Sequence, residues 1–410
     1  MLSDEVIDKV VERLVNRIEQ GNEYILKKIG NNIKKIGKLS TTEARQIAQI
    51  LKYGGDYDKI LKKLAEITEL NVKDITKIFD EVAKVDYDFA KQFYNFRNIK
   101  YTPYEYNYAL KKQVDSLKVI AMADYVNFSK TSAIGFSVKD INGNNIFKGL
   151  QQAYIDAIDN AVINVSQGKT TFEFEMRKML KELGESGIKS INYESGRTMR
   201  LDSAIRMNLK SALSNLHNEI QKQFGEEFGA DGVEISVHQN PAEDHEDAQG
   251  KQFRNEEWEK LQRGEEAATY QGEKVILKHS KNGSYRPISE LNCYHYIFSI
   301  IVGVSEPEYS KEQLEEIKEK NNQGFDFDGK HYTMYQGTQL QRRLETEIRK
   351  QKEMQVLYRS AGQEDEAMNV QSKINKLTDK YNDLNNISGL LPKEKRMSIS
   401  GYRKIKVKEE

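Results

Sequence analysis

The sequence predicts a mainly α-helical fold with a small α/β module built on a mixed sheet. It also predicts long helices at both ends and a C-terminal helical hairpin or coiled coil. Three observations support this. The 410 residues include only five prolines, so long segments can stay helical. Apolar residues recur at steps of three and four in both end regions, and short alternating segments between them indicate strands.

These patterns divide the chain into four regions. The N-terminal helical region covers 1–144, and a central helical region covers 145–229. The small α/β module spans 230–308, and the C-terminal hairpin and tail occupy 309–410. We therefore expect one module with strands between regions made of helices.

The first region begins with an amphipathic helix. Its apolar positions fall on one face at helical spacing, and the near-repeat "ILKKIGN" and "NIKKIGK" continues that stripe. A second helix is expected in "TTEARQIAQIL", with Ser40 or a following threonine as its cap. The apolar stripe consists of Ile7, Val11, Leu14, Ile18, Ile25, Ile29, Ile33 and Ile36.

Lysines cover the remaining faces of this first helix. A basic face can bind nucleic acid, but a solvated helix surface is the favoured interpretation. Lysine plus arginine and aspartate plus glutamate both total 63, so no net charge attracts the chain to DNA or to an anionic membrane. The lysines in question are Lys27, Lys28, Lys34, Lys35 and Lys38.

The central segment "VSQGKTT" looks like the end of a phosphate-binding loop. Such a loop needs a glycine five positions before Gly168, where this chain has Ile163. We predict instead that one helix stops at Gly168 and that the next begins with a capping box of Thr170 and Glu173.

The α/β module has three strand candidates. Val233, Ile235 and Val237 alternate in "VEISVHQ", and "EKVILKH" and "YIFSIIVGV" supply two more strands. The last of these is the longest apolar run. It is far shorter than the roughly 20 residues that cross a bilayer, so no membrane association is expected.

The C-terminal region returns to helical spacing. Leu340, Leu344 and Ile348 mark a helix that runs to about Tyr358. A second apolar seam follows, which we expect to pack against the preceding helix or against another subunit in a homo-oligomer. The seam consists of Ala367, Val370, Ile374, Leu377, Tyr381 and Leu384.

The module also holds the one cluster with candidate chemistry. Cys293 is the only cysteine, so the chain forms no internal disulfide. It stands two residues before His295, and pairing of the strands "VEISVHQ" and "YIFSIIVGV" would bring His245 to both. These three residues are speculative zinc ligands, with Asp244, Asp247 or His238 as a fourth.

Two other interpretations of the cluster stay open. A cysteine nucleophile with a histidine base needs a geometry that strand neighbours two apart rarely reach. A polar lock, in which the histidines satisfy turn carbonyls beside a buried thiol, needs only the residues present and is favoured. No cofactor is therefore expected. Without another catalytic constellation, the sequence indicates an interaction protein rather than an enzyme.

Several ordered motifs resemble those of the phage minor capsid protein 2 family, which looks related to the head-morphogenesis proteins typified by phage Mu. The resemblance covers roughly 150–360 and follows the order of these motifs. They are a tyrosine–serine–glycine–arginine element before an arginine-bearing helix, a histidine–glycine element, an asparagine–cysteine–x–histidine turn and a late glycine. The matching residues are Tyr193, Ser195, Gly196, Arg197, Arg206, His245, Gly250, Asn292, Cys293, His295 and Gly303.

The resemblance implies a structural minor head protein of a tailed bacteriophage. Such a protein would be made in the cytoplasm of the bacterial host and incorporated into the virion, with portal and capsid proteins as partners and a role in head assembly or DNA packaging. Non-specific contact with the packaged DNA through the lysine face would fit that place. The opposing class is a metal-dependent hydrolase carried in the head and delivered with the genome.

Overall fold

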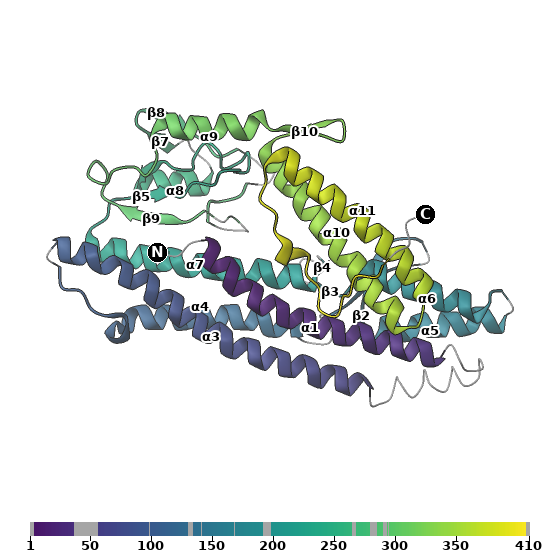
Figure 1. Ribbon diagram of the computed structural model, residues 1–410. Helices are drawn as coiled ribbons and strands as arrows, with labels where there is room; N and C mark the ends of the chain where they lie inside the picture. The colour runs from purple at the N-terminus through teal and green to yellow at the C-terminus, as the bar shows by residue number, and fades with distance from the viewer. Residues whose placement is uncertain are drawn as a thin grey trace.

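The computed structural model confirms a mainly helical chain with long helices at both ends and small sheets between them (Figure 1). It describes residues 4–36, 56–97, 99–129, 134–140, 142–167, 169–191, 198–264, 268–278, 285–289, 293 and 295–406.

Four long helices form the base of the molecule: α1 (Asp4–Ile36), α3 (Asp56–Arg97), α4 (Tyr108–Ser129) and α7 (Leu201–Phe228) (Figure 1). The short 3₁₀ helix η1 (Tyr104–Tyr106) lies between α3 and α4. The apolar stripe predicted for α1 is confirmed, since its positions from Ile7 to Ile33 are buried. The side chain of Ile36 and the cap predicted near Ser40 fall outside the described residues.

A four-stranded antiparallel sheet lies beside this bundle, within segments that the sequence indicated as helical. Its strands are β1 (Ile134–Lys139), β2 (Asn145–Gly149), β3 (Lys189–Ile191) and β4 (Thr198–Arg200), in the order β2-β1-β3-β4. Between β2 and β3 the chain forms α5 (Leu150–Ser166) and α6 (Phe172–Ser186), both of which pack on β1.

The capping box predicted at the start of α6 is wrong. The cap is Thr171, whose side chain accepts a hydrogen bond from the Phe174 N–H at 3.3 Å. Thr170 instead donates its hydroxyl hydrogen to the Glu175 side chain at 2.7 Å, so it does not cap the helix. The predicted helix stop, Gly168, lies outside the described residues, while α5 itself ends at Ser166.

The α/β module lies against α7, and its three-stranded sheet contains β5 (Gly232–Ile235), β6 (Gln252–Arg254) and β9 (Ile297–Ile300). The order is β6-β5-β9. Both pairings are antiparallel, so this sheet is not mixed as the sequence suggested. The predicted pairing of the first and last strands is confirmed, with Ile235 opposite Ile297.

Shorter elements complete this part of the chain. The segment "EKVILKH" contributes only the short strand β8. The elements are α8 (Asn255–Arg263), β7 (Ala268–Tyr270), β8 (Glu273–Val275), α9 (Lys311–Gln323), β10 (Phe325–Phe327) and β11 (Lys330–Tyr332).

The C-terminal helices α10 (Met334–Ser360) and α11 (Glu364–Ser388) form the predicted hairpin, followed by η2 (Glu394–Met397). The seam on α11 is confirmed, since Ala367, Val370, Ile374, Tyr381 and Leu384 are buried. The hairpin also packs on α1 and α6 through α10 (Figure 1).

Two cores matter for the site. The largest core draws side chains from α1, α3, α4, α7 and the C-terminal hairpin. A smaller one lies within the α/β module and includes Ile235, Phe253, Leu261 and Cys293. The division into four regions stays a prediction. Among the described residues, no helix combines the length and the apolar character that crossing a membrane requires.

Candidate metal centre

His245, Cys293 and His295 converge in the α/β module. One potential ligand atom from each lies within 4.8 Å of the others. The Cys293 Sγ is 3.3 Å from the His245 Nδ1 and 3.2 Å from the His295 Nδ1. All three residues are buried, with exposed fractions of 1% for His245, 5% for Cys293 and 4% for His295.

Strand pairing explains this convergence. Because β5 and β9 are antiparallel neighbours, the loop that leaves β5 meets the segment that enters β9. The loop returns at Gly250, whose N–H donates to the Ile235 carbonyl at 2.8 Å. Gly250 has φ +70°, and a Cβ there would lie 2.4 Å from the Leu314 Cδ2, so this position requires glycine.

The far nitrogen of each histidine makes a hydrogen bond of its own. The His245 Nε2 donates to the Arg286 backbone carbonyl at 2.8 Å. The His295 Nε2 lies 3.3 Å from the Gln249 Oε1. That same oxygen accepts the His238 backbone N–H at 2.9 Å, and a backbone N–H can only donate, so the amide orientation of Gln249 is fixed.

Burial dominates the electrostatics of the cluster. It lowers the pKa of His245, and together with the neighbouring His238 and His245 rings it lowers the pKa of His295 well below 6.5. Burial also raises the pKa of the Cys293 thiol, although the backbone N–H groups of His295 and Ser289 act in the opposite direction. The uncharged forms are therefore favoured at neutral pH.

The carboxylates considered as fourth ligands are engaged elsewhere. Asp244 forms a two-point ion pair with Arg286, at 2.8 and 3.0 Å. Asp247 pairs with Lys278 at 2.9 Å and with Lys318 at 3.0 Å. The remaining candidate is His238, whose ring centroid is 4.4 Å from that of His295.

The other motif residues are dispersed. Arg206 forms an ion pair with Glu12, which joins α7 to α1. Gly303 adopts φ +83° in the turn after β9, with open space around it. The remaining motif residues, Tyr193, Ser195, Gly196, Arg197 and Asn292, lie outside the described residues.

A buried ionic network between α7 and α10 was not found by sequence reasoning. Asp202 lies between Arg200, at 3.3 Å, and Arg349, at 3.1 Å. Arg200 also pairs with Glu353 at 2.6 Å. The one signal available was the acidic Asp202 in the first turn of a helix, a position that the helix dipole favours.

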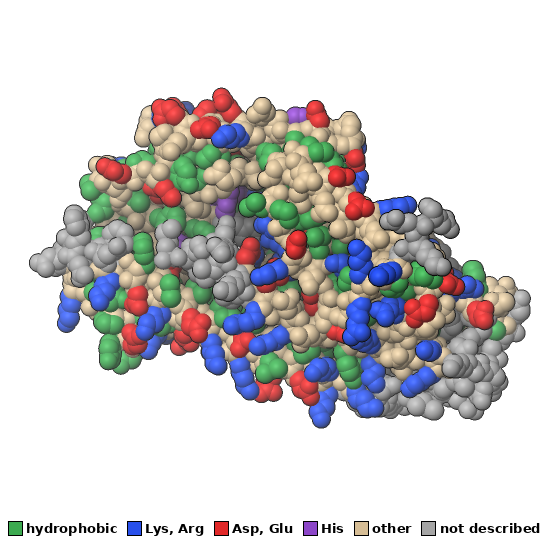
Figure 2. All heavy atoms as spheres, in the orientation of Figure 1, with side chains coloured by type: hydrophobic (Ala, Val, Ile, Leu, Met, Phe, Trp, Pro, Cys, Tyr) green, Lys and Arg blue, Asp and Glu red, His purple; other side chains and the backbone are tan. Residues whose placement is uncertain are grey.

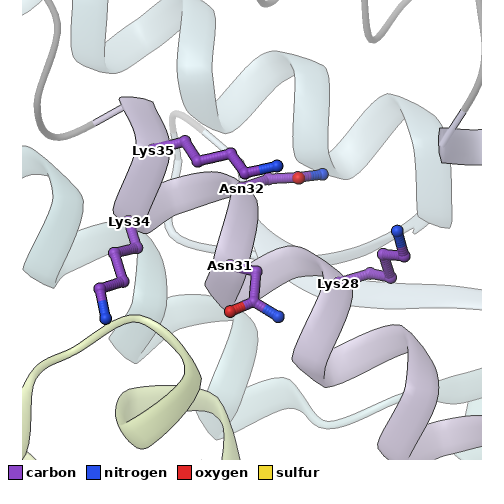
Figure 3. A pocket seen from close by; sticks show the side chains of 5 residues that line it. All are labelled: Lys28, Asn31, Asn32, Lys34 and Lys35. Atoms are coloured by element: carbon purple, nitrogen blue, oxygen red, sulfur yellow. The ribbon is translucent and has the colours of Figure 1, made fainter.

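The lysine face of α1 surrounds a shallow depression of about 420 Å³ near the end of that helix (Figure 3). Lys34 extends toward the loop between α10 and α11, and Lys27 pairs with Glu23. Across the face in Figure 2, basic and acidic side chains are interspersed. This distribution agrees with a solvated surface.

Comparison with known proteins identifies a family. The sequence model of a family described as "Phage minor capsid protein 2" matches residues 2–386. No curated protein and no solved structure matches the chain significantly.

Proposed function

The chain belongs to the phage minor capsid protein 2 family, and from this premise we propose that it binds portal or capsid subunits and assists head assembly or DNA packaging. The family itself gives the chain a structural role in a phage virion. Portal contact, the packaging role and synthesis in the host cytoplasm belong to the proposal.

The observation that carries the proposal is the extent of the family match, which reaches from residue 2 to residue 386 of 410. The match includes the N-terminal bundle and the C-terminal hairpin as well as the α/β module. A match along nearly the whole chain, rather than over one segment, extends the family's structural role to the N-terminal bundle and the hairpin as well as to the module.

The geometry argues against the opposing class, a metal-dependent hydrolase. A hydrolytic metal must keep one position open to water and substrate. Here none of the three cluster side chains is more than 5% exposed. A polymer such as DNA or peptidoglycan cannot reach these atoms unless the module opens.

The test is quantitative mass spectrometry of purified immature heads, mature heads and tails, using the host proteins of the lysate as a contamination control. The proposal predicts this chain in heads at a fixed ratio to the portal protein and its depletion from tails. Absence from immature and mature heads alike would contradict it. Cleavage of DNA or peptidoglycan by the purified chain, lost in His245→Ala, would establish the hydrolase instead.

A further inference from the structure

We infer that the α/β module binds one zinc ion through the His245 Nδ1, the Cys293 Sγ and the His295 Nδ1. This inference is independent of the role in the phage head. It makes the metal a structural cross-link between the loop after β5 and the segment before β9.

Counting protons in the cluster gives the first argument. The His245 Nε2 faces a backbone carbonyl and the His295 Nε2 faces a fixed amide oxygen, so each must carry a hydrogen. In neutral rings both Nδ1 atoms then present lone pairs to the Cys293 sulfur. The Cys293 thiol then has one proton for two Nδ1 acceptors. It can form a hydrogen bond to one of them, and the other Nδ1 faces the sulfur without a donor.

Adding a second proton to the cluster would give the remaining Nδ1 a hydrogen-bonding role, but at a large cost in free energy. It would place a net positive charge among residues that are at most 5% exposed. The carboxylate of Asp244, which is next to His245 in the sequence, is already paired with Arg286. A cation that replaces the thiol proton instead binds all three lone pairs at once.

The distances fit this exchange. Zinc bonds of about 2.3 Å to sulfur and about 2.0 Å to nitrogen, at a tetrahedral angle, separate sulfur from nitrogen by about 3.5 Å. The observed separations are 3.3 Å and 3.2 Å. Insertion of zinc therefore lengthens each sulfur–nitrogen separation by only about 0.2–0.3 Å, within the freedom of a side-chain torsion.

The surroundings are also those of a metal ligand set. Metal-binding histidines usually donate their other nitrogen to a carbonyl or carboxylate, as both histidines do to oxygens here. The contacts of the polar lock are thus the supports that a zinc site needs.

Three protein ligands leave one position of a tetrahedron. A water molecule or the adjacent His238 can take it, since the His238 ring packs directly on His295. Each zinc bound releases the Cys293 thiol proton to solvent. The metal would reinforce a small core, in which ten of the described apolar residues are buried.

The first experiment uses the full chain, expressed without a histidine tag in zinc-supplemented medium. Elemental analysis should give about one zinc per chain after gel filtration. Replacement by cobalt should give the intense visible bands of a tetrahedral site and a sulfur-to-cobalt charge-transfer band. Fewer than about 0.1 zinc per chain, with unfolding unchanged by added zinc or by a chelator, would overturn the inference.

Variants then locate the metal. Cys293→Ser and His295→Gln should each lower the zinc content at least about tenfold, and Cys293→Ser should abolish the charge-transfer band. His331→Ala is the matched control, because His331 is exposed on β11 and pairs only with Asp326 among the contacts described. Zinc content that survives the first two substitutions, or that falls with the control, would refute this ligand set. If a variant misfolds by circular dichroism, the cobalt spectrum of the wild-type chain still decides the matter.

Discussion

The ionic network between α7 and α10 gives the sharpest stability prediction. Asp202 is 1% exposed and lies between Arg200 and Arg349, while Glu353 balances the second positive charge. The substitution Asp202→Asn keeps the size of the side chain and removes its charge. One arginine charge is then left uncompensated in the interior.

The expected loss can be worked from the structure. Burial alone would raise the pKa of Asp202, but Arg349 and Arg200 lower it from 3.8 to about 2. That difference corresponds to about 2.4 kcal/mol in favour of the ionised form. Removing one partner of a buried ion pair typically costs about 3–5 kcal/mol. We therefore expect Asp202→Asn to lower the free energy of unfolding by about 2–5 kcal/mol.

The same pKa fixes the pH dependence. Because the folded-state pKa of Asp202 is depressed, its contribution is complete above pH 3.8 and is lost as the pH falls toward 2. The difference between wild type and Asp202→Asn should therefore shrink in that interval. Above pH 4.5 the difference should also narrow toward pH 8, because burial and the Asp202 charge together raise the pKa of Glu19, and Asp202→Asn removes the second cause.

Urea unfolding followed by two probes provides the assay. Far-ultraviolet circular dichroism reports on the helices, and the single tryptophan, Trp258, reports on the α/β module, where it packs on the smaller core. Glu69→Ala is the matched control, since the Glu69–Lys73 pair is exposed on both sides and solvent screens such a pair almost completely. If Asp202→Asn is no more destabilising than this control, the reasoning about the network is refuted.

Three further predictions concern the helices. Burial raises the pKa of Glu19 to about 8, so stability present below pH 4.5 is lost as the pH rises toward 8. In thermal melts, Glu19→Gln should have the same free energy of unfolding as wild type near pH 4.5 and a free energy up to about 5 kcal/mol higher above pH 8. A difference that does not change with pH would count against this prediction. A Cβ on Gly30 would lie 2.8 Å from a backbone oxygen of α10, whereas a Cβ on Gly184 would meet only flexible side chains. Gly30→Ala should therefore lower the free energy of unfolding by about 1–3 kcal/mol, and Gly184→Ala should not. Equal melting temperatures for the two variants would show that α10 shifts to make room for the Cβ. The purified chain should bind duplex DNA weakly, with an affinity that falls steeply as the salt concentration rises. Tight binding at physiological salt that is lost in Lys34→Ala/Lys35→Ala would contradict the interpretation of the α1 lysines as a solvated surface.

The sequence predicted the long elements well. The spacing of Ile7, Val11 and Leu14, and of Val370 and Ile374, reflects burial on one side of a helix, and that periodicity is directly visible in the residues. The pairing of β5 with β9 was also predictable, because both segments have the residue pattern of a strand. This pairing in turn brings His245 toward Cys293.

The four-stranded sheet could not be predicted in the same way. Strands β3 and β4 have three residues each, too few for an alternation to emerge, and "KSI" and "TMR" have no apolar pattern. Their pairing depends on contacts that α5 and α6 make with β1. The cap at Thr171 rather than Thr170 shows a related limit, since adjacent threonines are equivalent until the path of the chain is known.

The proposed metal ligand set required three-dimensional information of another kind. His245 and Cys293 are 48 positions apart, and neither has a partner at a spacing typical of zinc. The proposal of zinc instead of the polar lock rests on the direction of each Nε2 hydrogen bond, which leaves both Nδ1 atoms facing one sulfur. No sequence pattern encodes the tautomer of a histidine.

Cryo-electron microscopy of intact phage heads, reconstructed without imposed symmetry, tests the central claim most directly. The account predicts density at the portal vertex that fits the α1–α3–α4–α7 bundle and the C-terminal hairpin, in contact with portal or capsid subunits. A reconstruction in which every portal-proximal and capsid-lining density is explained by other proteins, from heads that mass spectrometry shows to lack this chain, would contradict it.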